Sequence, residues 1–270
     1  MSTQANLFQV VTFATDALHG NPAFVLSGAR GISDAALMAA CTILRTDVIA
    51  VVDEGSGGDV PLRFFTSKGA HGGAGHATLA AAHVALRNGP ARSNGARNAV
   101  VFHTSAGDRA ATIEGERIAV DFPAMPGSRI DRIAELEAAL GARPRESWAA
   151  PFGYVAVYDD AATIAAMRPD LDRVARFDRT AVIATAPSRD GADIVIRVFA
   201  PNVGLPEDPV CGTAHRIIVP YWAERLGRKQ IHSRQLSPRG GDLFCEDKGE
   251  VVAIGGDSRL VIDGTIRLPD

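Results

Sequence analysis

Several features of specialised proteins are scarce in this sequence of 270 residues. Only three cysteines occur, Cys41, Cys211 and Cys245, and no pair has CxxC spacing. An odd number without that spacing argues against a disulfide framework and against a structural zinc site, so reduced thiols are expected. No apolar run reaches the ~18 residues that a membrane-spanning helix needs, and MSTQANLFQ (1–9) lacks the basic flank and apolar run of a signal peptide. The expected compartment is therefore the cytoplasm.

Neither sign of charge dominates. The chain has 28 Lys and Arg against 31 Asp and Glu, a formal net charge of -3, and its basic residues are scattered. No basic patch for nucleic acid or an anionic membrane is predicted, so the expected partner is a small molecule. The glycine-rich stretch GAHGGAGHAT (69–78) fits neither GxGxxG in its strand-turn-helix context nor a Walker loop, because no Gly-Lys-Ser/Thr follows.

Short apolar runs bounded by Gly, Pro and Asp are abundant, and they are typical of β-strands. Strands are predicted at 8–13, 48–52, 61–65, 98–104, 117–122, 154–158, 181–186, 193–200, 250–256 and 258–263. Helical patterns separate them at 33–45, 75–88, 130–141, 159–167 and 212–226. This is an α+β pattern without strict βαβ alternation, which argues against a doubly wound nucleotide-binding sheet.

The two halves of the chain share a plan. Residues 62–86 and 196–222 each read as strand, polar loop, glycine and helix, with RFFT aligned to RVFA and GHAT aligned to GTAH. A repeat at half the chain length predicts two similar domains. The segment PAMPGSR (123–129), rich in Pro and Gly, is the expected linker. The alternative is that any two strand-loop-helix units look alike.

Both repeats place a glycine at the expected start of a helix. A helix that begins in a glycine-rich loop presents unpaired N–H groups and the positive end of its dipole, which favour an anion such as a carboxylate. Gly75 and Gly212 would let backbone approach the ligand closely. The alternative is that both glycines only permit tight turns.

The neighbouring residues favour a functional role for these loops. One loop carries His76 and the other carries Asp208, Cys211 and Thr213, all types that move protons or hold an enolate oxygen. Pro209 disfavours a helical conformation for Asp208, so its carboxylate is expected in the loop. A helix N-terminus can lower the pKa of Cys211, although a buried structural thiol is an equal alternative.

For two residues of these loops the sequence also allows an interpretation without a catalytic role. His76 on its own reads as a helix-cap histidine. Glu207, next to Asp208 in the sequence, is interpreted as a solvated surface charge.

The chain resembles the PhzF-type phenazine biosynthesis isomerases. The similarity lies in blocks that follow the family's order: GNPAFV (20–25), RFFT (63–66), GHATLAAAHV (75–84), IRVFAP (196–201), EDPVCGTAH (207–215), and Gln235 with RGG (239–241). The resemblance implies the diaminopimelate epimerase fold, with two pseudo-symmetric domains that each wrap a sheet around a central helix. The expected domains are 1–122 with 262–270, and 123–261.

The same resemblance implies a chemistry. It implies proton transfer without cofactor or metal, in a cleft between the domains, and commonly a homodimer. The family's proposed reaction moves a hydrogen within a dihydro-hydroxyanthranilate ring. The implied substrate is a small carboxylate that can carry an amino group.

Carried over onto this sequence, the resemblance makes His76 a substrate-contacting proton relay and Asp208 an acid that holds an amino group or shuttles a proton. Thr213 keeps the hydroxyl of the family's usual serine, and Cys211 is a further catalytic candidate. The partner of a two-cysteine racemase would fall near Ala74, so that mechanism is not expected. The residues expected to bind substrate are Gly75, His76, Ala77, Asp208, Gly212, Thr213 and Ala214.

One segment departs from the family. ILRTDVI (43–49) stands where the family has Asn-Leu-Ser-Glu-Thr-Ala-Phe, which supplies the catalytic glutamate. Aligned on Leu44, that glutamate falls on Thr46, and Asp47 is one position later. In an extended segment this shift points the side chain to the opposite face unless a bulge intervenes. Asp47 is the candidate replacement, and the loop 67–74 also lacks the acidic residue that many members carry.

Three functions therefore remain. The first is an isomerase or epimerase that uses His76 and Asp208, with Asp47 or Cys211 as the second proton carrier. The second is a non-catalytic relative that binds an acidic metabolite. The third, a metal enzyme built from His71, His76 and Asp208, is disfavoured because His-x4-His in a glycine loop fixes no ligand orientation.

Overall fold

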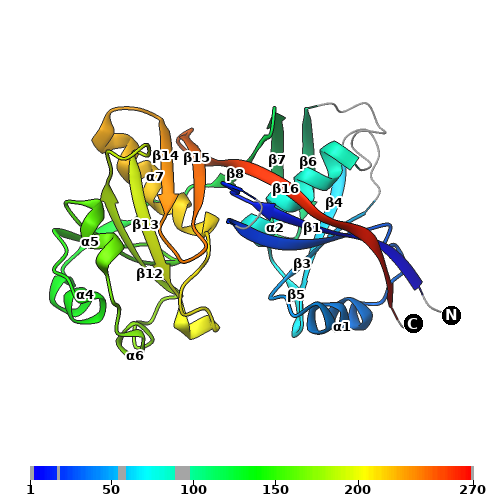
Figure 1. Cartoon of the computed structure of the whole chain (residues 1–270), viewed down its shortest axis with the longest axis horizontal. Coiled ribbons are helices and arrows are strands. Elements are labelled where there is room, and N and C mark those ends of the chain that lie inside the picture. The colour runs from blue at the N-terminus through cyan, green and yellow to red at the C-terminus, as the bar shows by residue number, and fades with distance from the viewer. Residues whose placement is uncertain (1–2, 17–18, 54–58, 89–97, 269–270) are drawn as a thin grey trace. The chain divides into compact units, whose positions relative to one another are not determined.

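The computed structural model describes residues 3–16, 19–53, 59–88 and 98–268 (Figure 1). Its contacts divide the chain into two compact units. Unit 1 comprises residues 1–121 and 255–270, and unit 2 comprises 122–254. The boundaries expected from the sequence are 122/123 and 261/262. No described helix is long and apolar enough to cross a membrane.

Unit 1 is a sheet wrapped around one helix. The sheet order is β1-β2-β3-β4-β6-β7-β8-β16, and β16 also pairs with β1, so the strands form a closed ring. The elements are β1 (Thr3–Thr12), β2 (Asn21–Ser27), α1 (Asp34–Leu44), β3 (Ile49–Val52), β4 (Asp59–Thr66), β5 (Gly69–His71), α2 (Gly75–His83), a π-helix (Val84–Asn88), β6 (Ala99–Thr104), β7 (Gly107–Glu114), β8 (Arg117–Pro123) and β16 (Val251–Leu268).

The enclosed helix is α2, which packs against β1, β2, β3 and β7. Every side chain from Ala77 to His83 is buried, and most are alanine. A helix buried on all sides needs no polar face, and small side chains let the strands approach it closely. The sequence GHATLAAAH therefore suits the centre of unit 1.

Unit 2 repeats this arrangement with α7 and adds small helices. Its sheet order is β9-β10-β11-β12-β13-β14-β15-β16. The elements are β9 (Ser128–Ile130), α4 (Ile133–Leu140), β10 (Glu146–Ala149), β11 (Gly153–Val157), α5 (Ala161–Ala166), α6 (Leu171–Val174), β12 (Ala181–Pro187), β13 (Ile194–Phe199), a 3-10 turn (Pro201–Val203), α7 (Gly212–Leu226), β14 (Gln230–Gln235) and β15 (Gly241–Asp247).

The sheet of unit 2 is buried on both faces. On one face α7 packs against β14 and β15, and the indole of Trp222 donates a hydrogen bond to Thr185 of β12 at 3.0 Å. Alternate side chains point to opposite faces of a strand. Val182 and Ala184 of β12 accordingly join the core that includes side chains of α4, α5 and α6.

The predicted strand-loop-helix plan is confirmed in both units. β4 precedes α2 and β13 precedes α7, and the two helices begin at Gly75 and Gly212. One prediction was wrong: 250–256 and 258–263 are not two strands but parts of the single strand β16. Gly255 and Gly256 resemble a turn signal, but both stay in the strand, and neither has a positive φ. The helix predicted at 75–88 changes to a π-helix after His83.

Candidate functional site

In unit 1, the start of α2 presents free backbone donors beside a histidine. Ala74 is the N-cap, and it offers no side-chain oxygen to cap the helix. The N–H groups of Gly75, His76 and Ala77 have no hydrogen-bond partner among the described residues. Such groups, with the helix dipole, attract an anion. The predicted substrate-binding residues of unit 1 thus lie together at one helix start.

His76 occupies the second position of α2 and is half-buried. Desolvation lowers the pKa of His76 to about 4. The imidazole is therefore neutral near pH 7, with one nitrogen able to accept a proton and the other able to donate one. No side-chain hydrogen bond to another described residue occupies either nitrogen. This state suits a proton relay.

In unit 2, the start of α7 brings Asp208 and Cys211 together. Cys211 is the buried N-cap, and its thiol donates a hydrogen bond to the Asp208 carboxylate. Burial and the negative charge of Asp208 raise the pKa of Cys211 well above its usual value, against the smaller lowering effect of the Ala214 and Thr213 N–H groups. The thiol is therefore protonated at neutral pH, so the alternative of a lowered pKa is not what the structure shows.

A glutamine side chain from β14 holds this loop in shape. The Gln235 carboxamide donates to the Asp208 carbonyl at 2.6 Å and accepts from the Cys211 N–H at 2.8 Å. The Ser237 hydroxyl donates to the Pro209 carbonyl at 2.5 Å. The Asp208 N–H donates to the carbonyl of Val198 at 2.9 Å. These bonds satisfy the backbone polar groups of a loop that is neither helix nor strand. They also fix the backbone position from which the Asp208 side chain extends.

His215, in the first turn of α7, stabilises the start of the same helix through its buried side chain. Its Nδ1 donates to the Cys211 carbonyl at 2.8 Å, which leaves Nε2 to accept from the Ser233 hydroxyl at 2.8 Å. The ring is fully buried, and burial lowers its pKa to about 4, against the opposite effect of the Cys211 carbonyl. His215 is thus a neutral structural residue of the α7 start.

This burial predicts acid sensitivity in unit 2. Below pH 6.5 His215 is protonated in the unfolded chain but not in the folded chain. Its contribution to the free energy of unfolding is therefore fully present above pH 6.5 and is lost as the pH falls toward about 4. One pH unit below 6.5, the loss is about 1.4 kcal/mol. Urea unfolding at about pH 7.5 and about pH 5.5, followed by tryptophan fluorescence, measures it. A His215→Gln variant should lose this share of the pH dependence, and an unchanged pH dependence would contradict the assignment.

Asp47 lies apart from both helix starts in the sequence, in the bend between α1 and β3. Arg45 ends α1 in the left-handed conformation, with φ 50°, and the Thr46 hydroxyl donates to the Val48 carbonyl at 3.1 Å. The Asp47 side chain is exposed, and the described residues offer it no hydrogen bond or ion pair. Its role as the replacement base stays a prediction.

Glu207 is not a solvated surface charge, so that prediction was wrong. Its carboxylate forms a two-point ion pair with Arg197, at 2.7 Å from Nε to Oε1 and 2.9 Å from Nη2 to Oε2. The side chains are only 15% and 11% exposed. Arg197 also donates to the Met167 carbonyl at 2.8 Å. An arginine within the apolar strand IVIRVF requires a buried partner, and this was the missed signal.

The described residues contain no group of three potential metal-ligating side chains. His71 lies in β5 and is exposed, and its Nδ1 accepts a hydrogen bond from the Gly73 N–H at 3.2 Å. Both helix starts, Gly75 to Ala77 and Gly212 to Ala214, are predicted from the sequence. The residues that shape the second one, Gln235, Ser237 and Arg197, are not.

The chain is similar to proteins of one family over nearly its whole length. The sequence profile described as phenazine biosynthesis-like protein (PhzC-PhzF) matches residues 10–264. An uncharacterized isomerase of Pseudomonas aeruginosa is 37% identical over 268 residues, which cover 98% of this chain and 100% of the relative. The crystal structure of a phenazine biosynthesis protein of the PhzF family from Enterococcus faecalis has a TM-score of 0.90 at 33% identity, covering 98% of this chain and 99% of the other.

A more distant structure shares the fold alone. A hydroxyproline epimerase from Agrobacterium vitis, solved with bound trans-4-hydroxy-L-proline, has a TM-score of 0.57 at 14% identity and covers 99% of this chain and 93% of the other. These neighbours confirm the predicted α+β, two-domain, epimerase-like fold. The chain belongs to the phenazine biosynthesis-like (PhzC-PhzF) protein family.

Proposed function

We propose that this protein is a cofactor-independent isomerase that moves a proton on a small carboxylated substrate, which can carry an amino group. The observation that carries the proposal is a pair of uncapped, glycine-started helices, one in each unit, each with proton-bearing side chains beside it. His76 stands at one start, and Asp208 with Cys211 at the other. Both units would contribute to one site, as the family resemblance implies.

The proposed chemistry needs no oxidant or reductant. A base removes a proton from carbon, the electron pair moves into the adjacent carbonyl or ring to give an enolate, and a proton is returned to another position or face. Free N–H groups at Gly75 or Gly212 would hold the substrate carboxylate or the developing oxyanion. Neutral His76 and the Asp208 carboxylate supply acceptors, and the protonated Cys211 thiol supplies a donor.

The relatives support isomerase activity in general. The Pseudomonas aeruginosa relative is named an uncharacterized isomerase, and it matches 98% of this chain. The absence of cofactor and metal, the homodimer and the cytoplasmic location expected from the sequence stay predictions. Asp47 is proposed as the second proton carrier, since it is the carboxylate nearest in sequence to the family's glutamate.

The second candidate is a metabolite-binding protein without catalysis. It is favoured by Thr46, a residue that cannot act as a carboxylate base and whose hydroxyl is occupied by the Val48 carbonyl. In this case the helix starts would still bind a carboxylate, but no substrate proton would be removed. The two candidates therefore differ in proton exchange rather than in binding.

One experiment distinguishes them. The wild-type protein is incubated in D₂O with a panel of small cyclic and aromatic amino acids and their dihydro forms, and deuterium at carbon is measured by mass spectrometry. The isomerase proposal predicts at least one compound that gains deuterium at a rate proportional to protein concentration. Compounds that raise the melting temperature without gaining any deuterium would instead support the binding protein.

A further inference from the structure

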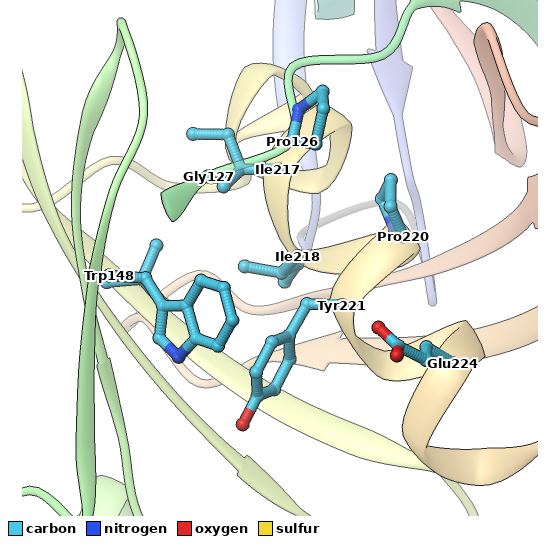
Figure 2. A pocket seen from close by; sticks show the side chains of 9 residues that line it. Pro126, Gly127, Trp148, Ile217, Ile218, Pro220, Tyr221 and Glu224 are labelled. Carbon is cyan, nitrogen blue, oxygen red and sulfur yellow. The ribbon is translucent and has the colours of Figure 1, made fainter. Parts of the chain in front are cut away.

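Unit 2 contains a pocket that the proposed function does not use. It has a volume of about 120 Å³ and lies between α7 and the strands β10 and β11 (Figure 2). Its α7 residues run from Ile217 to Glu224. At a rise of about 1.5 Å per residue, these lie about 7 to 18 Å along the helix from Gly212. The pocket is therefore separate from the start of α7.

The aromatic wall of the pocket is held rigidly. Trp148 and Tyr221 meet edge to face, with ring centroids 5.3 Å apart and planes at 71°. Both are tied to the buried carboxylate of Glu146: the Trp148 indole donates to it at 3.1 Å and the Tyr221 hydroxyl at 3.4 Å. Arg225 forms an ion pair with Glu146, so the negative charge behind the wall is compensated. The rings are thereby fixed before any ligand arrives.

The opposite wall is fixed by a proline inside α7. Pro220 has no N–H, so the carbonyl of Arg216, four residues earlier, lacks its helical partner. The Met125 N–H donates to that carbonyl at 2.9 Å, and the Arg216 Nε donates to the Pro123 carbonyl at 2.7 Å. These bonds fasten the segment that carries Pro126, another wall residue, to the helix. The pocket is therefore built by hydrogen bonds on both sides.

A single carboxylate gives the pocket its charge preference. Glu224 lines it, is exposed, and has no hydrogen bond or ion pair to its side chain among the residues with described positions. Figure 2 shows this carboxylate beside Tyr221 and Pro220. Aromatic rings attract cations. Arg225 already lies over the Tyr221 ring, 4.6 Å from its centroid, so the Trp148 ring is the one left for a ligand cation. A carboxylate without a partner adds to that attraction while repelling anions. The isoleucines that complete the lining favour alkyl groups over water.

We propose that this pocket binds a small organic cation, an alkylammonium head group. The pocket, at about 120 Å³, is somewhat smaller than the cavity of about 150 Å³ that accommodates benzene, so it has room for only a compact head group such as tetramethylammonium. The lining supplies only one charged acceptor, the Glu224 carboxylate. The pocket therefore suits an alkylated ammonium better than a primary ammonium, which needs several hydrogen-bond acceptors. The inference is independent of the isomerase proposal, because it concerns other residues.

The test uses tetramethylammonium chloride on the ¹⁵N-labelled full chain, followed through the two tryptophan indole N–H signals. Trp148 lines the pocket and Trp222 is bonded to Thr185, so only the Trp148 signal should shift, with saturation in the millimolar range. A Trp148→Phe variant assigns the signals. The neutral analogue tert-butanol should bind at least tenfold more weakly, and sodium pivalate should not bind, both at matched ionic strength.

A matched pair of variants tests the charge. Glu224→Gln should weaken tetramethylammonium binding about two- to fivefold, the range for an exposed charge, and leave tert-butanol binding unchanged. Glu114→Gln makes the same charge change on an exposed strand residue of unit 1 and should have no effect. Equal binding of tert-butanol and tetramethylammonium, an unaltered affinity in Glu224→Gln, or no Trp148 shift at about 100 mM ligand would each overturn the proposal.

Discussion

Asp208→Asn is expected to slow deuterium exchange into the substrate by about 10²- to 10⁴-fold, the range for losing a positioned general acid or base. The asparagine keeps the size of the side chain and can still accept a hydrogen bond from the Cys211 thiol, but it cannot take up a proton. The loop should keep its shape, because Gln235 and Ser237 bind its backbone rather than the carboxylate. The measurement is the exchange rate for the compound identified in the D₂O panel.

Two controls test whether the slower deuterium exchange is specific to the Asp208 carboxylate. Asp172→Asn makes the same change on an exposed residue of α6 in the same unit and should leave the rate unchanged. The melting temperature of Asp208→Asn should stay near that of the wild type. Exchange within threefold of wild type in both Asp208→Asn and His76→Ala would remove these residues from the mechanism.

Glu207→Gln is expected to lower the free energy of unfolding of unit 2 by about 3 kcal/mol, because it leaves the buried Arg197 guanidinium without an anionic partner. Arg197 would keep its bond to the Met167 carbonyl, so the loss should lie at the lower end of the range for broken buried pairs. Urea unfolding followed by fluorescence measures it, since both tryptophans of the chain lie in unit 2.

The matched control is an exposed pair in the same unit. Glu137 and Arg143 are bonded at 2.8 Å, but their side chains are 42% and 68% exposed. Solvent screens such a pair, so Glu137→Gln should cost less than about 1 kcal/mol. Equal small losses for Glu207→Gln and Glu137→Gln would mean that Glu207 behaves as a surface charge after all.

The two helix starts were predictable from the sequence because their signals are local. A glycine, short polar neighbours and an alanine-rich run mark the start of α2, and Pro209 followed by Gly212 marks the start of α7. The duplicated plan around Gly75 and Gly212 then indicated two units, which the epimerase-like fold confirms.

The residues that shape the second site were not predictable in this way, because their partners are distant or ambiguous. Gln235 reaches Cys211 across 24 positions, and no local pattern shows that its carboxamide closes the loop. Glu207 lies beside Asp208 in a loop with two prolines, and its burial depends on Arg197 in the preceding strand. For Asp47 the sequence allowed two orientations, and the structure places it in an exposed bend instead of a strand.

A crystal structure with anthranilate soaked in would show whether one substrate contacts both helix starts, as proposed. We expect the ligand carboxylate to accept hydrogen bonds from first-turn N–H groups at Gly75 or Gly212. We also expect His76 and Asp208 both to lie within about 2.6 to 3.2 Å of ligand atoms. A ligand that contacts the residues of only one helix start, with His76 or Asp208 turned away from it, would contradict the proposed isomerase site.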